Sequence, residues 1–140
     1  MRRIPNIKSV MTPFPYSIGI DRPLAEALAM MKEHGFRHLP VVENGVLVGV
    51  ASERHLRQVT GRTGTEAEPL VRDAPIGEAY VVGLDERLDN VVLAMAQRHL
   101  GAAVVARGGR VVGIFTSTDA CRYLGEVLRS EFPVGGDDVA

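Results

Sequence analysis

The 140-residue sequence repeats itself, and this repeat constrains the fold more than any other feature. At an offset of 64 positions, residues 16–58 align with residues 80–122 without a gap. The identical pairs fall on turn glycines and apolar positions, as at Gly49 and Gly113. Chance similarity would scatter identities over all residue types, so we infer a duplicated structural unit. One unit is too small to bury both faces of a sheet, and we expect the two to share a core.

Each unit has the pattern of a β-α-β-β-α element order. The runs "YSIGI" and "YVVGL" favour short strands. Apolar residues at helical spacing follow them, with Leu24, Leu28 and Met31 on one predicted face in the first unit. Two further β-prone runs are then separated by Asn44-Gly45 or by Gly108-Gly109, which is typical of a tight hairpin. A second helix closes each unit.

These elements predict a mixed α/β (α+β) fold with two tandem β-α-β-β-α units packed sheet to sheet as one pseudo-two-fold module. We place the first unit at residues 7–59 and the second at 70–128. The polar stretch 60–69 is the predicted linker, and 129–140 a predicted flexible tail.

Three side chains have predicted structural roles. Asp21 and Asp85 precede the first helix of each unit, where a carboxylate can cap the free N–H groups of the first turn. Cys121 lies on the last predicted helix, and we expect a buried or partly buried thiol. Because it is the only cysteine, no disulfide forms within the chain.

Charge and hydropathy exclude several classes of protein. The 16 basic and 17 acidic residues nearly cancel, which gives no general attraction to nucleic acid or to a membrane surface. Aromatic residues are only 5% of the chain, too few for extensive base stacking. No apolar run reaches the length of a membrane span, and the N-terminus does not have the pattern of a signal peptide. We expect a cytoplasmic protein.

The most specific segments are "VMTP", "LPVV" and the two phrases "GVASERHL" and "GIFTSTDA". Together with the repeat they resemble the CBS domain, over roughly residues 7 to 128. Two such domains in tandem form a Bateman module. The resemblance implies a regulatory, non-catalytic protein whose two inter-unit clefts take adenosine-containing ligands. It also implies pairing into homodimers, and this chain resembles the stand-alone members, whose effector would be another protein.

The resemblance assigns a ligand role to the second phrase. The family motif is glycine, two apolar residues, Ser or Thr, two variable residues and Asp, and the segment 113–119 matches it in full. An ionised Asp119 can accept hydrogen bonds from both ribose hydroxyls, and Thr116 suits the ribose or the α-phosphate. Further candidates are the helix-start residues and an apolar slot for adenine: Ser117, Thr118, Tyr80, Val81, Ala102 and Ala103.

The first phrase departs from the motif, because His55 stands where the family has Asp. A neutral histidine has a single acceptor nitrogen, so we expect this cleft to be weak, empty or used for something else. Its basic neighbours can still contact phosphates. The candidates from the first unit are Thr12, Arg37, His38, Ser52, Arg54 and His55.

The sequence therefore predicts a non-enzymatic sensor of AMP, ADP or ATP that requires no cofactor and signals to a partner protein. We expect no metal site and no catalytic residue, since phosphate loops and nucleophile motifs are absent from the sequence. Three alternatives stay open: a structural dimerisation module with empty clefts, a binder of S-adenosylmethionine, and a binder of nucleic acid.

Overall fold

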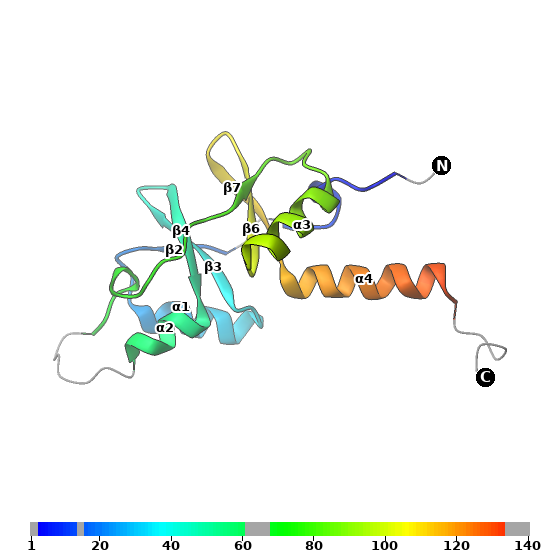
Figure 1. Ribbon diagram of the computed structural model, residues 1–140. Coiled ribbons are helices and arrows are strands. Elements are labelled where there is room, and N and C mark those ends of the chain that lie inside the picture. Colours follow the sequence, from blue (N-terminus) through cyan, green and yellow to red (C-terminus); the bar gives the residue numbers. More distant parts are fainter. Residues whose placement is uncertain (1–2, 14–15, 61–67, 134–140) are drawn as a thin grey trace.

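The computed structural model describes residues 3–13, 16–60 and 68–133, and it contains the two predicted units (Figure 1). Each unit has a small sheet flanked by two helices. The elements of the first unit are β2 (Ile18–Gly19), α1 (Leu24–His34), β3 (His38–Glu43), β4 (Val46–Ser52) and α2 (Glu53–Thr60). Those of the second are β5 (Val81–Val82), α3 (Leu88–Arg98), β6 (Ala102–Arg107), β7 (Arg110–Thr116) and α4 (Ser117–Glu131). The predicted element order and fold class are confirmed.

The strand connections follow from local sequence. β2 pairs parallel with β3, and β5 with β6, because a helix crosses over between the strands of each pair. β3–β4 and β6–β7 are antiparallel hairpins with two-residue turns. Asn44, Gly45, Gly108 and Gly109 all have positive φ, as a type I′ turn requires. The predicted hairpins are therefore confirmed.

The segments that precede the two units are exchanged between them. The first lead-in (residues 3–13) contains the 3-10 helix η1 (Ile7–Ser9) and β1 (Thr12–Pro13), which pairs with β7 of the second unit. The second lead-in (residues 68–77) contains η2 (Val71–Asp73) and packs on the first unit. The second sheet thus has the order β1-β7-β6-β5, and each unit is completed by chain from the other.

Two apolar cores result, one under each sheet. In the first core, α1 contributes Leu24 and Met31, and the second lead-in adds Val71. In the second core, α3 contributes Met95, and the first lead-in adds Ile7, which is fully buried. The sheets meet along β4 and β7. Because each lead-in packs on the other unit, the two units form one module rather than two independent domains.

Asp21 and Asp85 do not cap the following helices, so this expectation was wrong. α1 begins at Leu24 with Pro23 at its N-cap position, and no side chain caps it. The N–H of Leu24 donates instead to the carbonyl of Pro69 in the second lead-in, at 2.9 Å. α3 begins in the equivalent way. A partner distant in sequence replaces the local cap.

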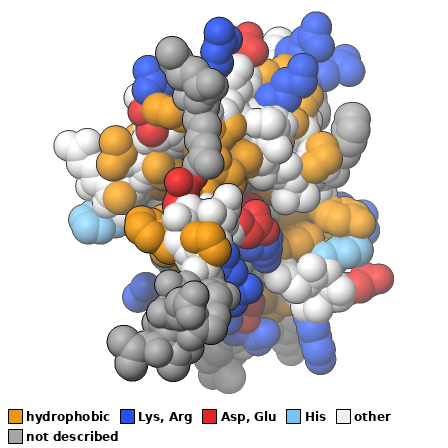
Figure 2. Space-filling model, turned by 90° about the vertical axis from the view of Figure 1, so that its right-hand side faces the viewer, with side chains coloured by type: hydrophobic (Ala, Val, Ile, Leu, Met, Phe, Trp, Pro, Cys, Tyr) orange, Lys and Arg blue, Asp and Glu red, His pale blue; other side chains and the backbone are white. Residues whose placement is uncertain are grey.

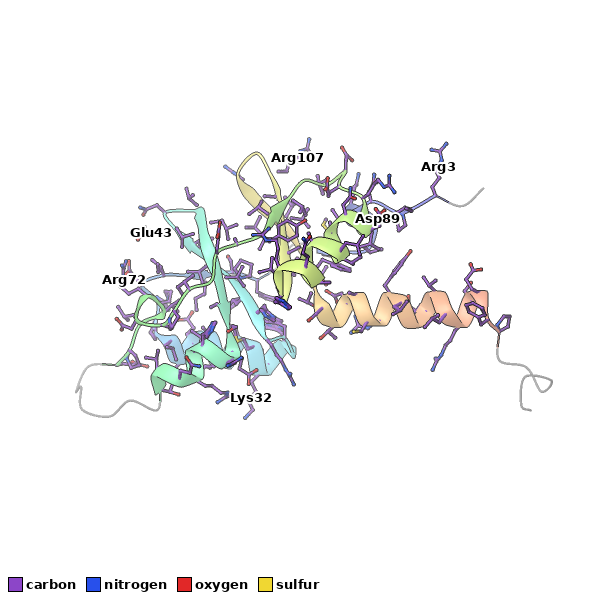
Figure 3. The ribbon with its side chains drawn as sticks, in the orientation of Figure 1. Arg3, Lys32, Glu43, Arg72, Asp89 and Arg107 are labelled. Atoms are coloured by element: carbon purple, nitrogen blue, oxygen red, sulfur yellow. The ribbon has the colours of Figure 1, made fainter. Side chains whose placement is uncertain are left out.

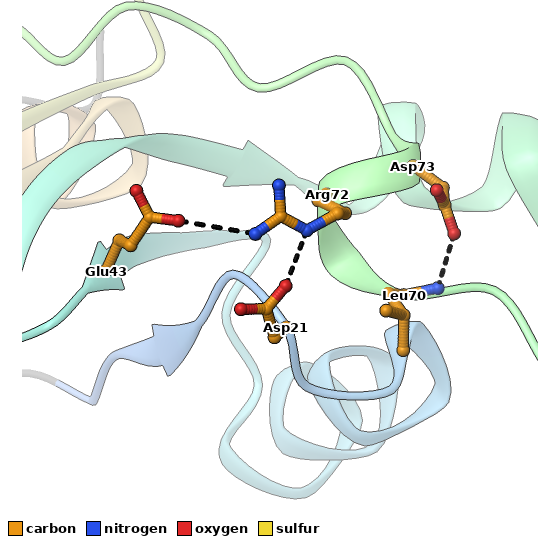
Figure 4. A network of polar contacts seen from close by, with 5 residues as sticks. All are labelled: Asp21, Glu43, Leu70, Arg72 and Asp73. Atoms are coloured by element: carbon orange, nitrogen blue, oxygen red, sulfur yellow. Dashed lines mark hydrogen bonds and ion pairs between the residues drawn. The ribbon is translucent and has the colours of Figure 1, made fainter.

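The Asp21 carboxylate instead accepts a hydrogen bond from Arg72 of the second lead-in, which lowers the pKa of Asp21 (Figure 4). Arg72 also pairs with Glu43 at the end of β3, at 3.3 Å. In the view with all side chains, Glu43 and Arg72 lie on the same side of the first unit (Figure 3). This network ties the second lead-in to the first unit.

α4 differs from its counterpart α2. α2 buries Leu56 and Val59, whereas α4 has no fully buried residue and projects past α3 (Figure 1). Cys121 is exposed, so the expectation of a buried thiol was wrong, because α4 leaves the core soon after its start. α4 ends at Glu131, inside the segment predicted as a tail. Most of the predicted linker and residues 134–140 of the predicted tail lie outside the described residues.

Within the part of the chain that the structure describes, no helix has the length and apolarity that a membrane crossing requires. The face toward which α4 projects carries hydrophobic side chains between basic and acidic ones (Figure 2). Charged side chains such as Lys32, Asp89 and Arg107 lie at the outer edges of the molecule, away from the junction of the units (Figure 3).

Candidate functional site: two cavities between the units

Two cavities lie where the units meet, and the repeat relates them to each other. The larger, about 720 Å³, is here called the Asp119 cavity. It is lined by Thr12, Tyr16, His34, Gly35, Phe36, Arg37, His38, Pro40, Ile114, Thr116, Ser117, Thr118, Asp119 and Arg122. The smaller, about 480 Å³, is the His55 cavity. It is lined by Arg37, His38, Val50, Ser52, Glu53, Arg54, His55, Arg57, Gly77, Glu78, His99, Leu100, Gly101 and Ala102.

The Asp119 side chain is held in place by the start of α4. The N–H and the hydroxyl of Thr116 donate to Asp119 Oδ2 at 2.8 and 3.0 Å, and the N–H of Asp119 donates back to Thr116 Oγ1 at 3.2 Å. This reciprocal pair is a capping box. Arg122 Nη1 donates to Oδ1 at 3.2 Å. A carboxylate has about four lone-pair positions, so acceptor capacity remains on Asp119.

A stack of rings forms another wall of the Asp119 cavity. Tyr16 stacks on His34 with ring centroids 4.0 Å apart, and on Phe36 at 5.8 Å. The Tyr16 side chain is half exposed, with a relative accessibility of 50%. A flat π-surface that is open to solvent can stack with a planar ligand such as a nucleobase.

Arg37 and His38, at the entry to β3, line both cavities. The imidazole of His38 lies directly over Gly101, where any Cβ would collide with the ring. Burial, and next the nearby Arg37 guanidinium, lower the pKa of His38, which keeps the imidazole neutral at pH 7. The repeat equivalents of this pair are Gly101 and Ala102, so the second unit has no basic pair at the corresponding position of its own strand.

The His55 cavity has the same architecture with different chemistry. Ser52 Oγ accepts a hydrogen bond from the N–H of His55 at 3.2 Å, so the helix cap of the motif is kept. The reciprocal carboxylate contact is absent because position 55 is histidine. Arg57 Nε pairs with Glu53 at 3.0 Å. His99, at the end of α3, adds a third imidazole to the lining.

The structure brings most of the candidate residues to these two cavities, though not all of them. Thr12, Thr116, Ser117, Thr118 and Asp119 line one, Ser52, Arg54, His55 and Ala102 line the other, and Arg37 and His38 line both. Neither lining includes the other three candidates, Tyr80, Val81 and Ala103. Ala103 is fully buried, Val81 faces solvent, and the Tyr80 ring is covered by the Arg98 guanidinium at 4.9 Å.

The ring wall beside Asp119 therefore comes from the first unit, and the residues expected to form an adenine slot do not line this cavity. Tyr16 is the repeat equivalent of Tyr80, and Phe36 is that of Leu100. Each cavity combines the motif of one unit with the end of the first helix of the other unit and the start of the strand that follows that helix. The sequence does contain a signal for Tyr16, because the offset of 64 residues maps Tyr80 onto it. That signal can be used only when it is known that each cavity takes residues from both units.

Comparison with known proteins finds one family twice in this chain. The family model of the CBS domain matches residues 7–61 and again residues 71–126. The CBS domain-containing protein YhcV of Bacillus subtilis is 25% identical over 114 residues, which cover 81% of each chain. A zinc metalloprotease of Methanocaldococcus jannaschii is 31% identical over 117 residues, which cover 84% of this chain and 31% of that protein.

A solved CBS domain pair has the same fold. It was determined in complex with 5′-methylthioadenosine and S-adenosyl-L-methionine, and it matches with a TM-score of 0.79 at 24% identity. The match covers 89% of this chain and 99% of that one. At this level of identity the likeness shows the fold alone.

Proposed function

Because this chain belongs to the CBS domain family and carries the domain twice, we propose that it is a regulatory protein that binds one adenosine-containing ligand in the Asp119 cavity. One observation carries the proposal. A carboxylate, a ring stack and a basic pair line the same cavity. These are the three chemistries that recognise a ribose, an adenine and a phosphate.

We assign the ribose to Asp119. With Thr116 and Arg122 as present donors, one ribose hydroxyl can add to the carboxylate directly, and a second requires Arg122 to withdraw. The Arg122 side chain is 64% exposed and is therefore free to move. The adenine would stack at Tyr16 and Phe36, where the ring wall is open.

The basic pair favours a nucleotide over S-adenosylmethionine. Arg37 and His38 lie on the side of the cavity contributed by the first unit, opposite the motif of the second. A guanidinium attracts phosphate oxygens and repels the positive sulfonium of S-adenosylmethionine. The related domain pair holds S-adenosylmethionine and methylthioadenosine, which supports the adenosine part of the assignment. We therefore propose AMP, ADP or ATP.

We further propose that two copies of the chain pair through α4 and that the ligand is sensed by an effector protein. Leu124, Val127 and Leu128 form an exposed apolar stripe on α4, continued by Phe132, which is 71% exposed. The same helix carries charges of both signs, so it does not repel a second copy. A ligand that contacts both units has different affinities for different relative orientations of the units. It therefore shifts the equilibrium toward one conformation, which the effector protein would recognise.

Isothermal titration calorimetry with AMP, ADP, ATP and S-adenosylmethionine tests the ligand assignment. We expect Asp119→Asn to weaken nucleotide binding about ten-fold or more, because one charged hydrogen-bond acceptor is lost. Asparagine can still accept the Thr116 N–H bond, so the start of α4 is preserved. His55→Asn, at the equivalent position of the other cavity, is the matched control and should bind nucleotide as the wild type does. Equal losses in both variants, or no binding of any ligand, would contradict the assignment.

A further inference from the structure

We propose that the His55 cavity is a second binding site, for a compact phosphate-chain anion such as inorganic triphosphate rather than for a nucleoside. The two cavities are related by the repeat, so their differences show which ligand each one suits. Arg37 lines both cavities, so this anion and the phosphate of the proposed nucleotide would share its guanidinium, whereas Arg54 lines the His55 cavity alone.

The first observation is the concentration of basic groups. Arg37, Arg54 and Arg57 line a volume of about 480 Å³, together with three imidazoles. Two carboxylates, Glu53 and Glu78, are the opposing charges in this lining. Three guanidinium groups against two carboxylates leave net positive charge even with every imidazole neutral. An anion would remove the repulsion among these cations.

The second observation is the state of the guanidinium groups. Arg57 is paired with Glu53, at 3.0 Å. Arg37 and Arg54 form no ion pair or side-chain hydrogen bond with another described residue. Each offers a planar fork of donors suited to two phosphate oxygens. The two guanidinium groups come from different elements, because Arg37 directly precedes β3 and Arg54 lies in the first turn of α2. They can therefore hold the two ends of a short phosphate chain.

The third observation is what the His55 cavity lacks. His55 replaces the ribose-binding carboxylate, and a neutral imidazole has only one acceptor. Tyr80, the equivalent of the ring that stacks beside Asp119, is outside the lining, with its face covered by Arg98. Gly101 stands where the other cavity has the larger Arg37, its repeat equivalent. The cavity has donors for an anion and little to hold a base and a ribose.

Calorimetry with inorganic triphosphate at constant ionic strength tests this inference. Arg54 lines only the His55 cavity and Arg122 only the Asp119 cavity, and both side chains are exposed, so neither substitution should unfold the protein. We expect Arg54→Gln to weaken triphosphate binding about ten-fold, which equals about 1.4 kcal/mol. Arg122→Gln and Asp119→Asn should leave it unchanged.

Two outcomes would overturn the inference. One is the absence of saturable triphosphate binding to the wild type. The other is a loss with Arg122→Gln instead of Arg54→Gln, which would assign the anion to the Asp119 cavity. Titration of AMP into Arg54→Gln separates a nucleoside ligand from a bare phosphate chain in the His55 cavity. We expect this variant to bind AMP as the wild type does, and a loss of about ten-fold in AMP affinity would show that the His55 cavity accepts a nucleoside, against the inference.

Discussion

At the scale of single residues, the repeated glycines of the two phrases are needed for close approach of the backbone. A Cβ at Gly113 would collide with the sulfur of Met11 in the first lead-in. A Cβ at Gly49 would collide with Ile76 and would lie 2.6 Å from the carbonyl oxygen of Gly77 in the second lead-in. Both glycines therefore sit where an exchanged lead-in crosses a strand of the other unit.

Gly113→Ala should accordingly destabilise the fold by about 1–3 kcal/mol, the usual cost of overpacking. The free energy of unfolding, measured in urea, gives the effect. Gly83→Ala is the matched control, because a Cβ at Gly83 meets nothing within 4 Å. If the two variants were equally stable, the close crossing of the first lead-in over β7 would be refuted.

His38 links the residue scale to pH. Its pKa is lowered in the folded protein, chiefly by burial, so the unfolded chain takes up a proton at higher pH than the folded one. The neutral His38 imidazole therefore contributes to the free energy of unfolding. This contribution is complete above the unfolded pKa of about 6.5 and is lost as pH falls through the folded pKa. We expect the wild type to lose more unfolding free energy between pH 7 and pH 5 than His38→Gln does, in thermal or urea unfolding at each pH. Parallel pH profiles would contradict this role.

At the scale of elements, α4 is the part of the fold whose packing is incomplete. It is longer than α2 by seven residues, as 15 compared with 8, and its added turns extend beyond the core. Leu124 and Leu128 are 57% and 47% exposed, one turn apart on one face. A stripe of this kind is stabilised when another surface covers it.

Leu124→Ser combined with Leu128→Ser should convert a dimer into a monomer. Each leucine removed from water contributes about 1.5–3 kcal/mol, and a symmetric contact counts each one twice. Sedimentation equilibrium over a range of concentrations measures the change. Arg129→Ser on the same helix is the control and should remain dimeric. A wild type that stays monomeric at every concentration would contradict the pairing.

The sequence predicted the elements whose determinants are local. The turns at Asn44-Gly45 and Gly108-Gly109 need positive φ, and the helical spacing of Leu24, Leu28 and Met31 falls within α1, which runs from Leu24 to His34. The exchange of lead-ins was not predictable in this way. The N–H of Leu24 donates to the carbonyl of Pro69, which is distant in sequence. An interpretation based on neighbouring residues therefore wrongly assigned the cap to Asp21.

The same limit applies to the site. The motif around Asp119 is contiguous in sequence, and Ile114 and residues 116–119 of it line one cavity. The opposite wall, with Tyr16 and Phe36, comes from the other unit, whereas sequence alone pointed to Tyr80, which lines neither cavity. The repeat signals which residues are equivalent, but only the packing of the units tells which copy faces which cavity.

At the scale of the whole molecule, duplication has produced two equivalent cavities with unequal linings. One combines a carboxylate with a ring stack, and the other is lined by arginines and histidines. Arg37 and His38 belong to both, so a ligand in either cavity acts on side chains that the other uses. We propose that an adenosine-containing ligand occupies the Asp119 cavity and not the His55 cavity.

An amide NMR titration with AMP tests that claim most directly, because it reports on both cavities in one experiment. We predict saturable shifts at Tyr16, Phe36 and Ser117, which line only the Asp119 cavity, with little change at Arg54 and Gly77, which line only the other. Matching shifts in both groups, or shifts confined to the His55 cavity, would contradict the account.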